Sequence, residues 1–135
     1  MNPILRPASP EDISPAGKIC YLAFKSIAEA HNFPPDFPNP ESAIELIRHL
    51  LSRTDVYAVI AEHEDRVVGS NFLWEDGAVA GVGPITVEPG MQNMRVGRRL
   101  MEAVLERARS RGIASVRLLQ AAYHGRSLSL YTRLG

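Results

Sequence analysis

The chain has 135 residues, of which 45% are hydrophobic, and its formal net charge at pH 7 is zero. This length and composition predict a single globular domain, residues 1–135, that is large enough to bury a core. A balanced charge excludes a global attraction to nucleic acid or to an anionic membrane. No apolar run reaches membrane-spanning length and no secretory signal is evident, so a cytoplasmic location is expected. The single cysteine, Cys20, excludes an internal disulfide and fits that reducing setting.

The start of the chain predicts a short strand followed by a helix. Residues 4–8, Ile-Leu-Arg-Pro-Ala, form the expected strand. Ser9 then stands at an N-cap position and Pro10 at the first helical position, while Asp12 is placed to close a capping box with Ser9. Apolar residues recur at helical spacing over residues 13–27, which predicts the first helix.

A proline-rich loop separates this helix from a second one. Residues 32–40 contain four prolines, which excludes a helix interior. The same loop carries Phe33 and Phe37. Pro40 begins the second helix, whose apolar face continues to Leu51.

The middle of the chain predicts an antiparallel meander of three strands joined by tight turns, at residues 56–62, 66–74 and 79–87. Pro84 lies inside the last of these, the central strand, and cannot donate a ladder hydrogen bond. It therefore marks a bulge or a place where neighbouring strands part. Residues 115–120 are expected to form a buried strand parallel to the central one, because they follow a strand–helix unit. A short closing helix is expected at residues 126–134.

A basic helix start follows the central strand. Its helix has an apolar stripe that includes Val96, Leu100, Val104 and Ala108, and Gly112 is placed to end it. Arg95, Arg98 and Arg99 gather where a helix has free N–H groups and partial positive charge, although acidic residues are expected there. Gly97 allows a ligand to approach the backbone. Each residue alone fits a solvated surface, but together the strand, turn and basic helix start indicate a phosphate cradle.

The segment Gln92-Asn93-Met94-Arg95-Val96-Gly97 resembles the pyrophosphate motif of the GNAT (Gcn5-related N-acetyltransferase) superfamily. That motif is Gln or Arg, two residues, Gly, one residue, then Gly or Ala, and Arg95 stands at its first glycine. The opening Arg-x-Ala-x-x-x-Asp is similar to the usual GNAT start. Near the end of the chain, Leu130 and Tyr131 match the family's closing helix, and His124 and Ser127 stand at its Asn and Ala positions.

The resemblance implies an α/β (α+β) fold with a mixed, mostly antiparallel central sheet flanked by helices. It also implies a parallel strand pair that splays at an acyl-CoA site, where the strand backbone of Ile85, Thr86 and Val87 binds the pantetheine arm of acetyl-CoA. The other cofactor-binding residues that it implies are Gln92, Asn93, Met94, Arg95, Val96, Gly97, Arg98, Arg99, His124 and Ser127. In this fold the loop after the first helix often borders the acceptor, so Phe33 and Phe37 either line that pocket or cap the core.

Tyr131 matches the tyrosine that many family members place near the thioester sulfur, where a phenol can protonate the departing thiolate. The residues alone favour an aromatic side chain that packs on the sheet with its hydroxyl exposed, whereas the resemblance favours the proton donor. Some members carry a carboxylate on the central strand that acts as the general base for the amine, but Gly81 stands at that position here. Glu75, Asp76, Tyr123 and His124 remain as candidate bases, and Glu88 lies in the turn at the phosphate end. The histidines lack metal-ligand spacing, so no metal is expected.

Two classes of function remain open. The first is an acetyl-CoA-dependent N-acetyltransferase that acts on a primary amine of a small molecule or a protein. The second is a non-catalytic acyl-CoA-binding domain of a larger protein, with neither a nucleic-acid nor a membrane partner expected. The family usually continues past Gly135 with further strands, so we expect a C-terminally truncated domain. The edge beside residues 115–120 would then be open, or covered by a further C-terminal segment or a second copy in a homodimer.

Overall fold

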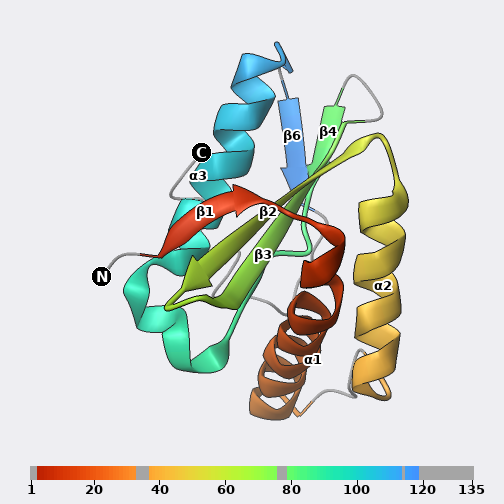
Figure 1. Cartoon of the computed structure of the whole chain (residues 1–135), viewed down its shortest axis with the longest axis vertical. Coiled ribbons are helices and arrows are strands. Elements are labelled where there is room, and N and C mark those ends of the chain that lie inside the picture. The colour runs from red at the N-terminus through yellow and green to blue at the C-terminus, as the bar shows by residue number, and fades with distance from the viewer. Residues whose placement is uncertain (1–2, 33–36, 76–78, 114, 119–135) are drawn as a thin grey trace.

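The computed structural model describes residues 3–32, 37–75, 79–113 and 115–118. It shows a mixed sheet with helices α1 and α2 on one face and α3 on the other (Figure 1). The strands are β1 (Ile4–Pro7), β2 (Val56–His63), β3 (Arg66–Trp74), β4 (Val79–Val82), β5 (Thr86–Val87) and β6 (Ser115–Leu118). The helices are α1 (Ile13–Ala30), α2 (Pro40–Ser52) and α3 (Val96–Ser110), with short 3-10 helices η1 (Pro10–Asp12) and η2 (Pro89–Met94).

The strand order is β1-β2-β3-β4-β6, and β5 also pairs with β3. All neighbours are antiparallel except β4 and β6, which run parallel. This arrangement confirms the predicted fold class, the antiparallel meander and the parallel pair. Each face of the sheet carries its own apolar core, one under α3 and one under α1 and α2. Cys20 lies fully buried in the second core.

The start of the first helix confirms the predicted capping box. The Ser9 backbone N–H donates to Asp12 Oδ2 at 2.8 Å. Arg6 on β1 donates to both oxygens of the same carboxylate at 2.8 and 2.9 Å, and to Glu62 on β2 at 3.1 Å. The hydrogen bond from Arg6 is the main cause that lowers the pKa of the Asp12 carboxyl below its usual value. The Arg6 guanidinium therefore connects β1 to β2 and to the residue before α1 through charged hydrogen bonds.

Helices α1 and α2 approach each other closely at Gly17. A Cβ built on Gly17 would lie 2.5 Å from the Cα of Ile44 on α2, a contact that only movement of a helix can relieve. We expect Gly17→Ala to lower the free energy of unfolding by about 3 kcal/mol, measured by urea denaturation. Gly90→Ala is the control, because a Cβ there meets nothing within 4 Å. A Gly17→Ala variant as stable as Gly90→Ala would contradict this packing.

The central strand is interrupted, so its prediction as one element over residues 79–87 is wrong. Leu73 pairs with Val82 and Ser70 pairs with Thr86, so three steps along β3 face four steps along the opposite strand. The extra residue is a bulge next to Pro84, which confirms that part of the prediction. Proline cannot donate to the ladder, and the strand therefore divides into β4 and β5.

Strand β6 differs from the buried strand that was predicted. Ser115 and Arg117 are exposed and Val116 is half-buried. Polar residues alternate with apolar ones here, so only one set of side chains turns toward the core beneath α3. Among the described residues, β6 pairs only with β4. The expected end of this strand, residues 119–120, and the closing helix lie outside the described residues, and what covers the edge stays a prediction.

Candidate functional site

The strongest candidate site is the connection from β5 to α3. The sequence predicts a turn at Glu88 and then direct entry into the basic helix start. The structure instead has the 3-10 helix η2 over Pro89–Met94, opened by a bond from the Met91 N–H to the Glu88 carbonyl at 2.8 Å. The backbone then changes direction at Arg95, and α3 begins at Val96. Two helical segments with different axes therefore meet at one residue.

That residue, Arg95, has a left-handed backbone with φ 58° and ψ 23°. Glycine adopts this conformation freely, whereas a residue with a Cβ is strained there by about 1 kcal/mol. Arg95 stands at the position of the first glycine in the motif that the sequence resembles. The backbone therefore has the geometry that a glycine at this position would allow, even though the side chain is an arginine.

We expect Arg95→Gly to raise the free energy of unfolding by about 1 kcal/mol, because it removes the strain of a Cβ in the left-handed region. Arg95→Ala is the matched control: it removes the same guanidinium but keeps the Cβ, so it should give no such gain. Urea denaturation of the two variants and the wild type measures the difference. Equal stability of the glycine and alanine variants would contradict a left-handed Arg95.

The first turn of α3 offers backbone donors to a ligand. The first intrahelical bond runs from the Arg99 N–H to the Arg95 carbonyl at 3.1 Å. The N–H groups of Val96, Gly97 and Arg98 therefore precede the helical i−4 ladder and lie at the positive end of the helix dipole. Val96 is buried and anchors this turn in the core, while Gly97 is half-buried. Such a helix start can bind an anion.

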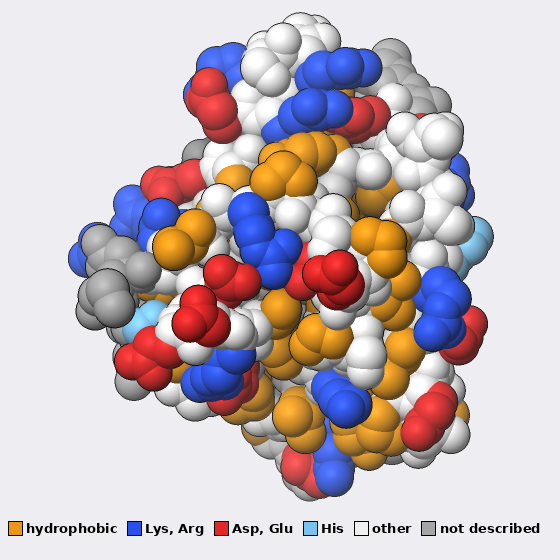
Figure 2. Space-filling model, in the orientation of Figure 1, with side chains coloured by type: hydrophobic (Ala, Val, Ile, Leu, Met, Phe, Trp, Pro, Cys, Tyr) orange, Lys and Arg blue, Asp and Glu red, His pale blue; other side chains and the backbone are white. Residues whose placement is uncertain are grey.

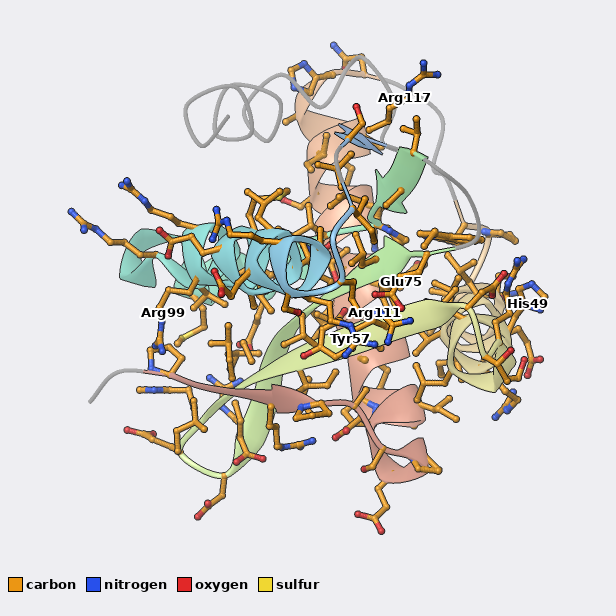
Figure 3. All side chains as sticks on the ribbon, turned by 90° about the horizontal axis from the view of Figure 1, so that it is seen from above. His49, Tyr57, Glu75, Arg99, Arg111 and Arg117 are labelled. Carbon is orange, nitrogen blue, oxygen red and sulfur yellow. The ribbon has the colours of Figure 1, made fainter. Side chains whose placement is uncertain are left out.

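The three arginines at this helix start do not converge in the structure. Arg99 donates to the carbonyl of Pro3 and so reaches toward the start of β1, as Figure 3 shows. The Arg98 guanidinium lies 3.8 Å from the Glu102 carboxylate, one turn further along α3. Arg95 is exposed, and no acidic side chain in the described part of the chain pairs with it. Their binding of a phosphate stays a prediction, and of the three Arg95 needs the least rearrangement.

The backbone of residues 85–87 continues this site along the sheet. The Glu88 N–H donates to the Val68 carbonyl at 2.8 Å, and Thr86 pairs with Ser70. Bonding groups alternate in direction along an antiparallel strand, so Val87 turns its N–H and carbonyl away from β3. Thr86 is buried, with its hydroxyl 3.2 Å from the Ser70 hydroxyl. This segment therefore presents backbone groups on the side away from β3, next to the start of α3.

Other predicted site residues lie elsewhere or outside the description. The backbone of Gln92, Asn93 and Met94 belongs to η2, directly before Arg95. The expected cofactor-binding His124 and Ser127, the candidate acid Tyr131 and the candidate bases Asp76 and Tyr123 lie outside the described residues. Within the described residues, no three His, Cys, Asp or Glu side chains come together as a metal site.

Glu75, a candidate base, takes part in a structural ion pair. Its carboxylate accepts from Arg107 Nε at 2.9 Å and Nη2 at 3.4 Å, and that guanidinium lies 4.5 Å from the centroid of the Tyr57 ring. Figure 3 shows Tyr57 and Glu75 near each other beside α3. The bond to Glu75 raises the pKa of Arg107. Glu88, in turn, pairs with Arg66 on β3.

Phe37 packs edge-on against Phe24, with ring centroids 5.7 Å apart, and belongs to the core under α1 and α2, which favours the capping role. Phe33 lies outside the described residues. Figure 2 shows basic and acidic side chains intermixed over the face that it presents. In the described part of the chain, no helix is both long and apolar enough to cross a membrane.

A bulged sheet strand, a left-handed residue and the start of α3 thus lie next to one another, and comparison with known proteins identifies the family to which this arrangement belongs. Residues 24–135 match the model of the acetyltransferase (GNAT) family. The chain belongs to this family.

Individual relatives agree with this assignment. The chain is 27% identical over 111 residues to an IAA acetyltransferase of Azospirillum brasilense, which covers 81% of this chain and 72% of that protein. It is similar in fold to the PaiA N-acetyltransferase of Thermoplasma acidophilum in complex with coenzyme A, with a TM-score of 0.81 at 18% identity over 100% of this chain and 89% of the other. A GNAT acetyltransferase of Brucella melitensis in complex with acetyl-CoA gives a TM-score of 0.73 at 20% identity, over 99% and 82% of the two chains.

Proposed function

We propose that this protein is an acetyl-CoA-dependent N-acetyltransferase that transfers an acetyl group to a primary amine of a small molecule or a protein. The observation that carries the proposal is the left-handed Arg95 between η2 and α3. It gives the backbone the left-handed turn of the motif's glycine, directly before the first-turn N–H groups of α3, where an anion can bind. Family membership and the coenzyme A or acetyl-CoA named for two similar folds support acetyl-CoA as the acyl donor.

In this proposal the binding groups divide along the cofactor. The backbone of Ile85, Thr86 and Val87 holds the pantetheine arm, because part of this segment faces away from β3. The diphosphate binds at the turn and helix start formed by Gln92, Asn93, Met94, Arg95, Val96, Gly97, Arg98 and Arg99. His124 and Ser127 are proposed as further cofactor contacts on the closing segment.

The reaction needs three coordinated events. The amine nitrogen attacks the thioester carbonyl, the carbon–sulfur bond breaks, and the amine gives up a proton while the leaving thiolate gains one. We assign protonation of the thiolate to Tyr131. For the proton from the amine, Glu75 is a poor candidate because both of its oxygens accept from Arg107. Asp76, Tyr123 and His124 remain as candidates.

A non-catalytic acyl-CoA-binding domain is the second candidate function. It is favoured by one specific feature: β4 carries Gly81 where some relatives carry a carboxylate, and Glu75, the acidic residue directly after β3, is paired with Arg107. In either case we propose a cytoplasmic protein, consistent with a single cysteine that is buried in the core. A homodimer is one way to cover the second edge of β6.

A turnover assay on the full chain separates the two functions. The protein is incubated with acetyl-CoA and, in separate reactions, an aliphatic amine, an aromatic amine and a lysine-containing peptide, and both coenzyme A thiol and acetylated amine are quantified. An acetyltransferase releases the two products in equal amounts and only when an amine is present. Binding of acetyl-CoA in calorimetry without acetylation of any amine would favour the non-catalytic domain.

A further inference from the structure

The interruption between β4 and β5 leaves two backbone groups without their usual partners. The Gly83 N–H donates to the Phe72 carbonyl at 2.9 Å, and in a regular antiparallel pair the Phe72 N–H would return a bond to the Gly83 carbonyl. The structure replaces this bond with two side-chain bonds. The Phe72 N–H donates to Asn71 Oδ1 at 2.9 Å, and the Gly83 carbonyl accepts from Trp74 Nε1 at 2.8 Å.

Asn71 uses the other half of its carboxamide to reach α3. Its Nδ2 donates to the Leu100 carbonyl at 3.3 Å, one turn after the helix begins. Asn71 is fully buried, so a carboxamide here is tolerated only because both ends are bonded. One side chain therefore connects the strand that faces the bulge with the helix whose start is the candidate phosphate site.

The two parts of the site are also in close contact at Gly69, two residues earlier on β3. A Cβ built there would lie 2.8 Å from the Thr86 carbonyl oxygen, 3.0 Å from Leu100 Cδ1 and 3.3 Å from Val96 Cγ1. Strand β5 and the first two turns of α3 thus pack around one point of β3. In a close-packed interior, a shift of the helix at this point is transmitted directly to β5.

We propose that Asn71 is a positioning residue for acyl transfer, which holds the bulge before β5 and the start of α3 at one fixed separation. This role rests on the proposed function, in which β5 holds the pantetheine arm and α3 holds the diphosphate of the same acetyl-CoA molecule. A cofactor bound at both places gains affinity only when their separation matches its own length, because preorganised sites avoid the cost of ordering on binding. Asn71 touches neither the cofactor nor the reacting atoms.

The test uses two substitutions at Asn71 in the full chain. Asn71→Leu keeps the same branched arrangement of side-chain heavy atoms, although it is bulkier, and lacks both hydrogen bonds. Asn71→Asp retains them in acid, where a protonated carboxyl can donate to the Leu100 carbonyl and accept from the Phe72 N–H. At higher pH the buried carboxyl group loses its proton. The negative charge of the resulting carboxylate then faces the Leu100 carbonyl oxygen. Val59→Ala is the control, because Val59 is buried opposite Asn71 on β2 and its truncation costs packing alone.

The measurements are the dissociation constant of coenzyme A by calorimetry, the KM values for acetyl-CoA and amine, and urea denaturation. We expect Asn71→Leu to weaken coenzyme A binding and raise the KM for acetyl-CoA by about tenfold, with the KM for amine unchanged. Asn71→Asp should bind like the wild type at about pH 5 and lose about tenfold relative to the wild type at about pH 8. Val59→Ala should lose stability but keep its affinity. If Asn71→Leu fails to fold, the two pH values for Asn71→Asp carry the test.

Two results would overturn the proposal. One is wild-type affinity in folded Asn71→Leu, or in Asn71→Asp at both pH values. The other is an equal loss of affinity in Val59→Ala, which would show that stability alone governs binding. Failure of the wild type itself to bind coenzyme A would overturn the proposed function and this role with it. Trp74 is the chain's one tryptophan, and its Nε1 donates to the Gly83 carbonyl at the bulge. The fluorescence emission of ligand-free Asn71→Asp should therefore depend on pH, and that of the wild type should not. This measurement reports separately whether Asn71 holds the bulge in place.

Discussion

Gly97→Glu is expected to weaken coenzyme A binding by more than about tenfold while the domain stays folded. Gly97 is the second residue of α3 and is half-buried, so a substitution there adds a side chain within the first turn of the helix. Glutamate adds a negative charge at the point where the diphosphate is proposed to bind. The helix itself tolerates this change, because acidic residues are favourable in a first turn. Titration calorimetry with coenzyme A measures the effect, and urea denaturation confirms the fold.

Ser110→Glu is the matched control for charge. It adds the same side-chain charge at the exposed last residue of α3, about 20 Å from Gly97 along the helix axis. At physiological salt that distance exceeds the screening length of about 8 Å, so affinity should not change. Unchanged affinity in Gly97→Glu would remove the assignment of the diphosphate to this helix start. Equal losses in both variants would point instead to a general effect of net charge.

Tyr131→Phe should lower kcat by about 100-fold and leave the KM for acetyl-CoA nearly unchanged. A phenol that protonates the departing thiolate interacts with it only as the carbon–sulfur bond breaks, so its removal affects the transition state and not the bound cofactor. Steady-state kinetics with the amine found in the turnover assay give both constants. The pH profile of the wild type should also lose activity as the phenol ionises, and this limb should be absent from the variant.

Tyr21→Phe provides the control for loss of a phenolic hydroxyl. Tyr21 lies half-buried on α1, with the Lys25 ammonium 5.8 Å from its ring centroid, and belongs to the core on the other face from α3. This variant should keep its kcat. If Tyr131→Phe also keeps its kcat and changes only the free energy of unfolding, Tyr131 packs on the sheet and another group protonates the thiolate.

The sequence by itself determined the elements whose signals are local. The capping box of Ser9 and Asp12, the apolar stripe of α3 and the end of that helix at Gly112 all appear in the structure as predicted. Gly112 has φ 71°, and the Ile113 N–H bonds to the Ala108 carbonyl at 2.9 Å, which is the Schellman arrangement. These features depend on residues within one or two turns of each other, so spacing and residue type were sufficient to predict them.

The candidate site was predicted in outline for the same reason, but its geometry was not. The motif indicated a helix start after a strand, whereas the 3-10 helix η2 and the left-handed Arg95 were missed. An arginine normally disfavours that conformation, so the residue type at this position did not indicate it. One feature of the sequence could have indicated the left-handed conformation: Arg95 occupies a position where the GNAT motif has glycine.

Only the tertiary structure decided which distant residues meet. Glu75 pairs with Arg107, although it was a candidate base from the sequence, and Arg99 bonds to the Pro3 carbonyl, although it was a predicted phosphate ligand. Asn71 showed no signal at all within a strand pattern, yet it is buried between the bulge and α3. Hydrogen bonds between elements depend on register and on how the layers pack, and these are properties of the assembled sheet. The residue pattern of one segment specifies neither the strand register nor the packing of the layers. The division of the central strand, and the side chains that bond at its bulge, were therefore evident only in the folded chain.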